Sequence, residues 1–364
     1  MILLYVFGAV ALINCCYYFI FIQFSFLKPT ERVSAEKPPV SLIVCAKNEA
    51  ENLENHIPFW LNQNYPAFEL ILINDASTDE TLEVMEGFAK NDPRIQIVNV
   101  KNNEAFWGNK KYALTLGIKR AKNRRMVFTD ADCYPASQNW LEAMSSHFTE
   151  EKQLILGYGA YEKQPGFLNK LVRFETLLTA IQYFSYAQIG IPYMGVGRNL
   201  AYTSALFYEK NGFIKHIKIA SGDDDLFVNE AATEKNTAIC ITPESFTYSL
   251  PKKDMKKWFS QKKRHYTTAK LYKPLHRILL GIYYIANLLF WLLSVIILFT
   301  QFWKYGLAII TLRFIIQYIV IGKAAKKLRE ADLIFLIPFY ELFLVLSQLS
   351  IFISRSDEKN SQWK

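Results

Sequence analysis

Two acidic residues separated by one small residue follow a short apolar run in the middle of the chain. The segment reads Arg-Arg-Met-Val-Phe-Thr-Asp-Ala-Asp and ends in Asp130 and Asp132. Because residues two apart in an extended chain lie on the same side, both carboxylates can hold one hard divalent cation. Such an arrangement suits an enzyme whose divalent metal ion binds a diphosphate. Cys133 is adjacent, but a hard cation prefers oxygen, so we interpret its thiol as a packing group.

Polar side chains also follow two other strand-like segments. Asn48 and Glu49 come after the apolar run at 39–46, and Asp75 and Asp79 come after the run at 68–73. A single Asp after a strand is more often a helix cap than a ligand, and we interpret residues 77–79 as partly a cap. Three acidic turns at successive strand ends are a stronger signal for a binding site than any one of them alone.

The elements that must position these residues alternate between strand and helix. The sequence predicts strands at 39–46, 68–73, 95–100 and 126–129, and helices at 48–60, 80–90 and 110–121. Apolar strands joined by helices predict an α/β fold with a mostly parallel mixed sheet that is buried on both faces. Ligands of such sheets bind beyond the carboxyl ends of the strands, which is where the acidic turns fall.

The composition fits one soluble domain plus membrane segments. The chain has 364 residues, is 51% hydrophobic and carries a formal net charge of +9. That charge suits an anionic membrane surface, phosphorylated substrates or nucleic acid, and charge alone does not choose among them. The five cysteines form no Cys-x-x-Cys pair, so neither a disulfide framework nor a zinc site is indicated.

Four apolar segments are long enough to cross a bilayer. Residues 1–27 carry no charged side chain and lack a basic leader, so we interpret them as an uncleaved transmembrane anchor. Further spans are predicted at about 278–301, 305–322 and 333–353. We therefore divide the chain into the anchor (1–27), a soluble domain (38–250), an amphipathic interfacial segment (251–275), three transmembrane helices (278–353) and a tail (354–364).

The lysines and arginines next to the spans predict the orientation in the membrane. They cluster on both sides of the soluble domain and between the third and fourth spans, and such clusters stay on the cytoplasmic side. The uncharged stretch 176–197 could be a fifth span, but two glutamines and Pro192 interrupt it, and we expect an interfacial or core helix instead. Arg313 and Glu341 lie near the middle of their spans, and we predict a buried ion pair, with contact to a lipid acceptor as the alternative.

The ordered motifs from about Val40 to Tyr266 resemble those of family 2 glycosyltransferases with the GT-A nucleotide-diphospho-sugar fold, in their membrane-anchored form. Val-Ser-Leu-Ile-Val-Cys-Ala-Lys-Asn-Glu resembles the opening strand and turn of the family, which implies that Ala46 and Glu49 contact the nucleoside. Ile-Asn-Asp-Ala-Ser-Thr-Asp resembles the Asp-Gly-Ser-x-Asp turn, which implies that Asp75 hydrogen-bonds the base, usually uracil. Here an alanine replaces the common glycine.

Two further motifs resemble the part of the family that holds the donor phosphates. Gly-Asn-Lys-Lys-Tyr-Ala-Leu-Thr resembles Gly-Lys-x-x-Ala-Leu-Asn with one inserted residue, which implies that Lys110 holds phosphates. Lys111 could equally be a solvent-exposed lysine at the start of a helix, with no role in binding phosphate. Thr-Asp-Ala-Asp resembles the Asp-x-Asp motif, which implies that Asp130 lies near the ribose or sugar and that Asp132, with Asp130 beside it, holds Mg²⁺ or Mn²⁺.

The later motifs resemble the acceptor side of the family. Gly-Val-Gly-Arg-Asn-Leu-Ala-Tyr resembles a glycine-rich loop, which implies acceptor-side roles for Gly197, Arg198 and Asn199; a plain tight turn is the alternative. Ser-Gly-Asp-Asp-Asp-Leu resembles Thr-Glu-Asp-x-Asp-Leu, in which an Asp is the general base. The register makes Asp223 the base, and Asp224 is the alternative.

A basic segment after the soluble domain resembles the Gln-x-x-Arg-Trp box of membrane-bound synthases. It reads Gln-Lys-Lys-Arg-His, which implies that Gln261 and Arg264 lie near the acceptor or the diphosphate, with His265 in place of the tryptophan. That replacement favours single transfers over processive synthesis. Apolar residues around the box recur at helical spacing opposite lysines, which predicts a helix on the membrane surface.

The resemblance implies an inverting transfer of a sugar from a nucleotide-diphospho-sugar, usually a UDP-sugar, to a lipid or glycan acceptor. The reaction is expected at the cytoplasmic face of a bacterial inner membrane, in the synthesis of envelope polysaccharide or glycolipid. We expect other envelope-biosynthesis proteins as partners and no nucleic acid. Two alternatives stay open, a polyprenyl-phosphate sugar synthase and a non-catalytic nucleotide-sugar-binding scaffold; the Gln261 and Arg264 box argues against the first, and the intact acids argue against the second.

Overall fold

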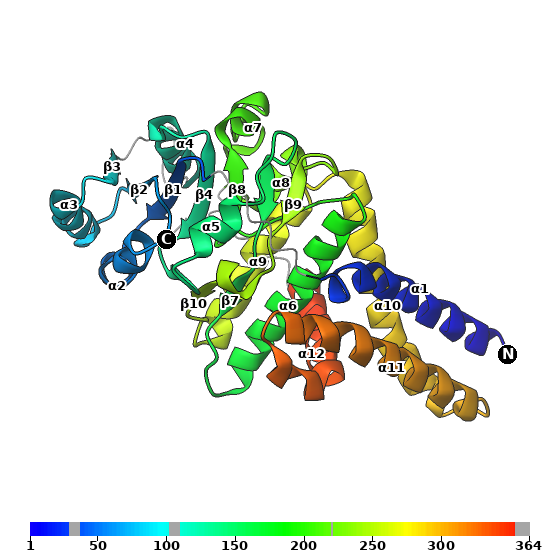
Figure 1. Cartoon of the computed structure of the whole chain (residues 1–364). Helices are drawn as coiled ribbons and strands as arrows, with labels where there is room; N and C mark the ends of the chain where they lie inside the picture. Colours follow the sequence, from blue (N-terminus) through cyan, green and yellow to red (C-terminus); the bar gives the residue numbers. More distant parts are fainter. Residues whose placement is uncertain (29–36, 102–109, 220, 354–364) are drawn as a thin grey trace.

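A mixed seven-stranded sheet lies at the centre of the protein (Figure 1). The computed structural model describes residues 1–28, 37–101, 110–219 and 221–353. The strand order is β3-β2-β1-β4-β8-β6-β9, and the first four strands are parallel while β8 runs antiparallel to both of its neighbours. The strands of this sheet are β1 (Val40–Ala46), β2 (Phe68–Asp75), β3 (Ile95–Val100), β4 (Arg125–Asp130), β6 (Leu154–Leu156), β8 (Leu200–Thr203) and β9 (Thr237–Ile239).

The parallel half of the sheet confirms the elements predicted from the sequence, including the mostly parallel order. β1 pairs with β2 and β4 so that Ala46 lies opposite Asn74 and Cys45 lies opposite Asp130. The carboxyl ends of these three strands therefore meet at one edge of the sheet. The acidic turns that follow these strands lie at that edge. They are the turns from which the sequence predicted a binding site.

Alternate residues of each central strand enter two different hydrophobic cores. Leu42 and Val44 of β1 join the core that contains Trp60 and Trp140, whereas Ile43 belongs to the other core with Phe174. This alternation follows from the two-residue period of a strand, and it requires apolar residues at both phases. The continuous apolar run at 40–46 is therefore explained by helices on both faces of the sheet.

Helices cover both faces, and a small second sheet lies beside the first. The second sheet has the order β5-β10-β7, from β5 (Cys133–Pro135), β7 (Gly159–Tyr161) and β10 (Thr247–Ser249). The helices within the soluble region are α2 (Ala50–Leu61), α3 (Thr81–Asn91), α4 (Lys110–Arg120), α5 (Trp140–Ser145), α6 (Phe167–Gln188), α7 (Ser204–Glu209), α8 (Asp225–Ala231) and α9 (Met255–Ala269).

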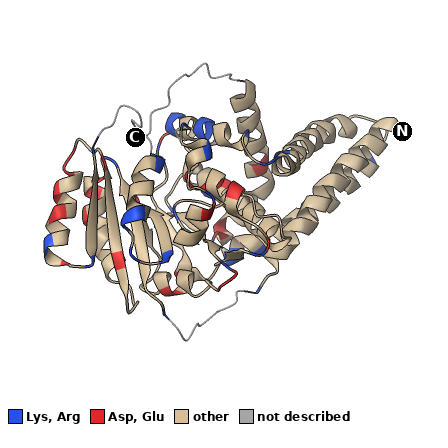
Figure 2. Cartoon of the chain, turned by 90° about the horizontal axis from the view of Figure 1, so that it is seen from above, with Lys and Arg blue, Asp and Glu red and all other residues tan. Residues whose placement is uncertain are grey.

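Four long apolar helical segments match the predicted spans by length and composition. They are α1 (Ile2–Ser25), α10 (Pro274–Leu298), α11 (Trp303–Lys327) and the segment Ala331–Ile353, which ends in α12 (Ile337–Ile353). Figure 1 shows α1, α10 and α11 projecting together from the sheet domain, and Figure 2 shows that they carry few charged residues. These segments indicate an integral membrane protein. The predicted tail at 354–364 lies outside the described residues.

The stretch at 176–197 belongs to a core helix rather than to a fifth apolar span. Its first part lies in α6, which packs against α1, α11 and α12 and against strands β7 and β9. Phe184 of α6 stacks on Phe24 at the end of α1, with 5.0 Å between the ring centroids. The anchor helix and the soluble domain thus share one hydrophobic core.

The predicted intramembrane ion pair is present. Arg313 Nη2 lies 2.8 Å from Glu341 Oε2, and both side chains are buried. The same nitrogen donates to Asn287 Oδ1 of α10 at 2.9 Å and to Asn14 Oδ1 of α1 at 3.3 Å. One guanidinium therefore links all four apolar segments through hydrogen bonds that bilayer lipid could not replace.

Candidate active site

Two turns at the carboxyl edge of the sheet are tied to each other. Asn48 donates its backbone N–H to Ser77 Oγ at 3.0 Å, and its Oδ1 accepts from the backbone N–H of Thr78 at 2.8 Å. Ala76 has φ of +49°, which is the left-handed region where glycine is favoured. The turn thus keeps the backbone shape that a glycine would supply, despite the alanine. Asp79 accepts from Thr81 N at the start of α3, although the N-cap residue itself is Glu80 and makes no side-chain cap bond; Ser77 and Thr78 bond to Asn48 and not to α3.

The residues expected to bind the nucleoside lie together beside these turns. Ala46 ends β1 and Asp75 ends β2, and both are buried. Glu49 is half-buried, receives a hydrogen bond from Asn52, and has a pKa raised by its burial. The strand register alone brings the first two within reach of one ligand. Their contact with a nucleoside remains a prediction.

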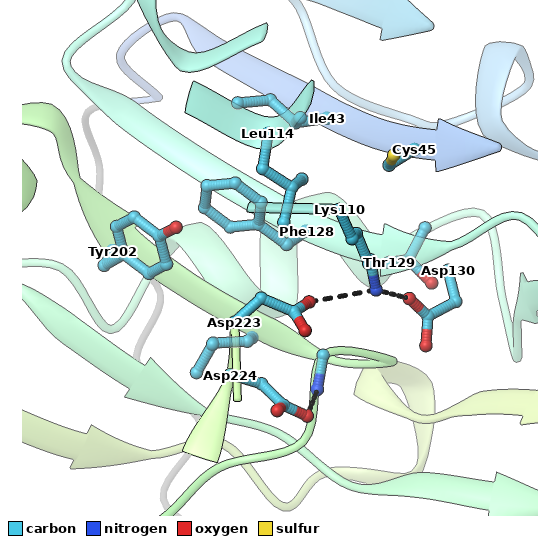
Figure 3. A pocket seen from close by; sticks show the side chains of 12 residues that line it. Ile43, Cys45, Lys110, Leu114, Phe128, Thr129, Asp130, Tyr202, Asp223 and Asp224 are labelled. Carbon is cyan, nitrogen blue, oxygen red and sulfur yellow. Dashed lines mark hydrogen bonds and ion pairs between the residues drawn. The ribbon is translucent and has the colours of Figure 1, made fainter. Parts of the chain in front are cut away.

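Lys110 lies between the two groups of acids that the sequence separates by about 90 residues (Figure 3). Its Nζ lies 2.7 Å from Asp130 Oδ1 and 3.0 Å from Asp223 Oδ2. Burial disfavours the charged lysine, but the two carboxylates raise the pKa of Lys110 well above its ordinary value. All three line one pocket together with Thr129, Asp224 and several apolar side chains. The pocket therefore joins the donor-side strand end to the predicted base.

Three consecutive aspartates each contact a different element. Asp223 pairs with Lys110 of α4, and Asp224 accepts from the backbone N–H of Gly197 at 2.7 Å. Asp225 accepts from the hydroxyl of Thr268 in the last turn of α9 and from that of Tyr272 just after this helix. Gly222 precedes them with φ of +94°, and a Cβ there would lie 2.5 Å from Leu226. This backbone explains why a glycine stands where the resembling motif has glutamate.

The environments of Asp223 and Asp224 push their pKa values apart. Burial raises the pKa of Asp223, but the Lys110 ammonium and its hydrogen bond outweigh that effect and lower it below the ordinary range. Burial raises the pKa of Asp224 to about 7, and repulsion from Asp223 and Asp225 adds to the effect. Asp224 also caps α8, since its Oδ1 accepts from Asp225 N at 2.7 Å.

The glycine-rich loop brings one of its three predicted residues into the pocket lining. Gly197 lines the pocket and holds Asp224 through its backbone N–H. Arg198 stacks on the ring of Tyr161 at 4.2 Å and is not among the lining residues. Asn199 is fully buried, and its amide bonds to the backbone of two loops and to the Trp140 indole. Its direct contact with an acceptor is therefore not supported, because its polar atoms hold the surrounding loops together.

Two carboxylates and a thiol form a group of side chains that could surround a cation. Ligand atoms of Asp130, Asp132 and Cys133 lie within 4.8 Å of one another. Cys133 Sγ donates to Asp132 Oδ1 at 3.3 Å, and burial raises the pKa of this thiol well above its ordinary value. A protonated thiol leaves the two carboxylates as ligands, which suits a hard cation such as Mg²⁺ or Mn²⁺.

Lys111 is buried rather than solvated. Its Nζ donates to the carbonyl oxygens of His216, Ile219 and Ser221 at 2.8, 3.0 and 2.7 Å. Burial lowers the pKa of Lys111 to about 8. The two lysines at the start of α4 thus hold the acidic segment, residues 223–225, in two ways. Lys110 contacts the carboxylate of Asp223, and Lys111 binds the backbone carbonyls just before the segment.

The basic box lies on α9, outside the lining of the pocket. Gln261 and Arg264 are partly exposed, and neither is among the lining residues. The side chain of His265 lies outside the part of the chain that the structure describes. On the same helix, Trp258 is buried and Lys262 pairs with Glu175 of α6, so α9 packs on the soluble domain.

Comparison with known sequences identifies the domain. Residues 41–205 match glycosyl transferase family 2. The chain contains a family 2 glycosyltransferase domain. The chain is similar to an uncharacterized glycosyltransferase of Haemophilus influenzae, with 35% identity over 34% of this chain and 36% of the relative. It is also similar to a poly-beta-1,6-N-acetyl-D-glucosamine synthase of Staphylococcus epidermidis, with 30% identity over 41% of this chain and 33% of that protein. The matches thus span about a third of the length of these relatives.

A solved structure shows that the likeness extends to the fold. The mannosyltransferase PcManGT from Pyrobaculum calidifontis, determined in complex with GDP-Man and Mn²⁺, aligns with a TM-score of 0.58 and 16% identity. The alignment covers 93% of this chain and 99% of that one. The GT-A architecture expected for a family 2 domain is therefore confirmed. The apolar helices that were predicted at both ends of this chain are also present.

Several side chains of the site gave no signal in the sequence. Thr268 and Tyr272 reach Asp225, which belongs to the recognised acidic motif, across more than 40 residues. For Lys111 the sequence left two interpretations open. The only available signal for Lys111 was its place beside Lys110 at the start of a helix. Threonine and tyrosine after an amphipathic helix carry no pattern that would separate them from ordinary packing residues.

Proposed function

We propose that this protein is an inverting glycosyltransferase that moves a sugar from a nucleotide-diphospho-sugar to a hydroxyl of a lipid or glycan. The observation that carries the proposal is the position of Lys110, within 3.0 Å of both Asp130 and Asp223 in one pocket. Asp130 ends a strand at the edge where donors of such sheets bind, and Asp223 belongs to the segment that resembles the family base. The Lys110 ammonium thus lies between the donor-side acid Asp130 and the acceptor-side acid Asp223.

Asp223 is the proposed general base. Its carboxylate takes the proton of the acceptor hydroxyl while that oxygen bonds to the anomeric carbon from the side opposite the leaving group. The bond from this carbon to the diphosphate oxygen breaks, and its electron pair stays on the diphosphate. A positioned base of this kind contributes on the order of 10² to 10⁴ in rate. Attack from the opposite side inverts the anomeric centre without a covalent intermediate.

Lys110 has two proposed roles. Its ammonium neutralises charge on the diphosphate as the bond breaks, and before the donor binds it holds Asp223 ionised. A diphosphate would compete for the ammonium and release the Asp223 carboxylate toward the acceptor. A divalent cation held by Asp130 and Asp132 would add Lewis-acid stabilisation of the leaving group. Ala46, Glu49 and Asp75 are the proposed nucleoside contacts.

The membrane setting supports an acceptor at the cytoplasmic face of a bacterial inner membrane. Four apolar segments indicate membrane insertion, and the basic residues beside them follow the positive-inside rule. The relative from Staphylococcus epidermidis is a polysaccharide synthase, and PcManGT was solved with GDP-Man and Mn²⁺. These likenesses support an envelope glycan or glycolipid product, a nucleotide-sugar donor and a divalent cation for this chain.

The test uses the full chain in detergent with a panel of UDP- and GDP-sugars plus Mn²⁺. We expect release of nucleoside diphosphate with one donor, and at least about a 100-fold loss in the Asp223→Asn variant. The matched control is Asp92→Asn, because Asp92 pairs with Arg94 just before β3, at the opposite end of the sheet from the pocket. Full activity of Asp223→Asn would refute the assignment of the base, and no release from any donor would refute the proposed activity.

A further inference from the structure

The helix that carries the predicted base is fastened to the segment that enters the membrane. We call residues 268–276, from the end of α9 into the first turn of α10, the membrane-proximal segment. Thr268 Oγ1 donates to Asp225 Oδ2 at 2.5 Å, and Tyr272 OH donates to the same oxygen at 2.7 Å. The other oxygen, Oδ1, accepts from Leu226 N at 2.7 Å. Asp225 is buried, so its carboxylate depends on these donors in place of water.

A second pair of contacts repeats the attachment one helical turn later. Asn229 Oδ1 accepts from the backbone N–H of Lys273 at 2.9 Å, and Asn229 Nδ2 lies 2.9 Å from His276 Nδ1. Residues four apart lie on one face of a helix, so Asp225 and Asn229 present one side of α8 to the membrane-proximal segment. A seven-residue helix held at two successive turns of one face has little freedom to shift.

The other end of this connection leads into a helix that is long and apolar enough to cross a membrane. The membrane-proximal segment continues directly into α10, one of the four apolar segments. At its other end, α9 is held to α6 through the Lys262 and Glu175 pair. Contacts with the segment that leads into the apolar helices therefore hold α8 in place. The donor-side acids are instead held in place by the sheet.

We propose that the membrane-proximal segment sets the position of the catalytic base, with Thr268 and Tyr272 as positioning residues that act through Asp225. Asp223 and Asp224 immediately precede Asp225, so any movement of the start of α8 moves both carboxylates relative to Lys110 and Asp130. The donor-binding edge of β1, β2 and β4 makes no part of this attachment. The proposal rests on the proposed glycosyl transfer for its kinetic test, and it predicts that loss of the attachment slows the chemical step while donor binding stays intact.

Two adjacent threonines of α9 provide a matched pair of variants. Thr268→Val removes the hydroxyl that reaches Asp225, whereas Thr267→Val removes an exposed hydroxyl that donates to the carbonyl of Arg264 on the same helix. Both changes have the same effect on helix propensity. Thr268→Ser keeps a hydroxyl at the first position, and Tyr272→Phe removes the second donor with little change in volume.

The kinetic test measures kcat and the donor KM of the full chain in detergent. We expect kcat to fall by roughly 10- to 100-fold in Thr268→Val and in Tyr272→Phe, since a displacement of about 1 Å has effects of this size. The donor KM should stay within about twofold, Thr268→Ser should recover most of kcat, and Thr267→Val should match the wild type. Equal kcat in Thr268→Val and Thr267→Val, or a loss that Thr268→Ser does not recover, would overturn the proposal.

Amide hydrogen exchange over residues 223–231 gives a readout that does not need activity. We expect faster exchange there in Thr268→Val and Tyr272→Phe than in Thr267→Val, with unchanged exchange in β1 and β2. If Thr268→Val does not fold, Tyr272→Phe alone decides. If the wild type transfers no sugar, the proposed function fails, and the exchange comparison still decides whether the segment holds α8; unchanged exchange at 223–231 would overturn that attachment.

Discussion

Asp224→Asn is expected to stabilise the protein at alkaline pH and to destabilise it only near or below pH 3.8, the ordinary pKa of this carboxyl. The folded protein holds the pKa of Asp224 at about 7 because of burial and two neighbouring carboxylates, against an ordinary value of 3.8. Folded protein therefore binds a proton more tightly than the unfolded chain between these two values. Stability falls as pH rises through this window, and above pH 7 the folded state carries the full cost of an ionised Asp224.

The size of the effect follows from this difference in pKa. Raising the pKa from 3.8 to about 7 corresponds to an upper limit of about 4 kcal/mol of lost stability at alkaline pH. Asparagine removes that charge, but its one oxygen replaces two acceptors that now hold Gly197 N and Asp225 N, a loss of about 1 kcal/mol. The variant should gain up to about 3 kcal/mol at pH 8.5 and stay within about 1 kcal/mol of the wild type at pH 5, because the unfolded chain is already ionised there; it should lose about 1 kcal/mol only below pH 3.8.

The neighbouring substitution should act in the opposite direction. Asp223 is stabilised as an anion by Lys110, so its contribution is present above pH 3.8 and disappears only as pH falls through its lowered pKa. Asp223→Asn should therefore lower stability by about 1–3 kcal/mol at pH 5 and at pH 8.5 alike. Lys110 keeps Asp130 as a partner, which limits the loss.

Thermal unfolding of the detergent-solubilised chain, followed by tryptophan fluorescence, measures both variants. A gain of 3 kcal/mol corresponds to a rise in Tm on the order of 6 °C. The reasoning would be refuted if Asp224→Asn lowered Tm equally at pH 5 and pH 8.5, because Asp224 would then carry no buried charge to remove. A rise in Tm for both neighbouring variants at pH 8.5 would equally contradict the assignment of the Lys110 partner.

Three further outcomes are expected. Lys111→Met leaves three carbonyls of the acidic segment without their shared donor and should lower stability by about 1–3 kcal/mol and reduce transfer, whereas the exposed Lys119→Met on the same helix should change neither; equal effects would contradict the anchor role. Removing divalent cations with EDTA should abolish nucleoside diphosphate release, Mn²⁺ should restore it, and Asp132→Asn should not recover with Mn²⁺; activity that persists in EDTA would argue against the metal. Arg313→Leu leaves a buried carboxylate without its cation and should lower stability by about 3–5 kcal/mol, and adding Glu341→Leu should recover much of it; equal losses of folded protein in membranes would argue against pairing.

The parallel half of the fold could be predicted because local signals there agree with the tertiary structure. The run at 40–46 is apolar at both phases since it is buried on both faces, and the polar turns after β1, β2 and β4 fall at one edge because parallel strands end together. The other half was missed. Strands β6, β7, β9 and β10 have three residues each, too few to show a period of two.

The site was predicted from motifs, and the structure changes how two of its members act. Lys110 was expected on a phosphate, and here it joins two carboxylates whose motifs are far apart in sequence. Asn199 was expected at the acceptor, yet its amide is buried among backbone carbonyls. Sequence spacing cannot separate these cases, because a buried structural amide and a ligand-binding amide occupy the same position of a loop motif.

The triple aspartate explains why a short segment can serve both the chemistry and the architecture. Each carboxylate satisfies a different neighbour, so the backbone at 223–225 is fixed by Lys110 of the sheet domain, by the Gly197 loop and by the membrane-proximal segment at once. Three acids in a row, of which Asp225 is buried and the other two are partly buried, repel one another, which is unfavourable unless each has its own partner. The cost falls on Asp224, whose partners are neutral backbone groups rather than a cation or a pair of hydroxyls. A segment held only by its own helix would avoid that repulsion. The arrangement therefore fits the proposed role, in which Asp223 is aligned with the donor pocket and with the membrane-proximal segment at the same time.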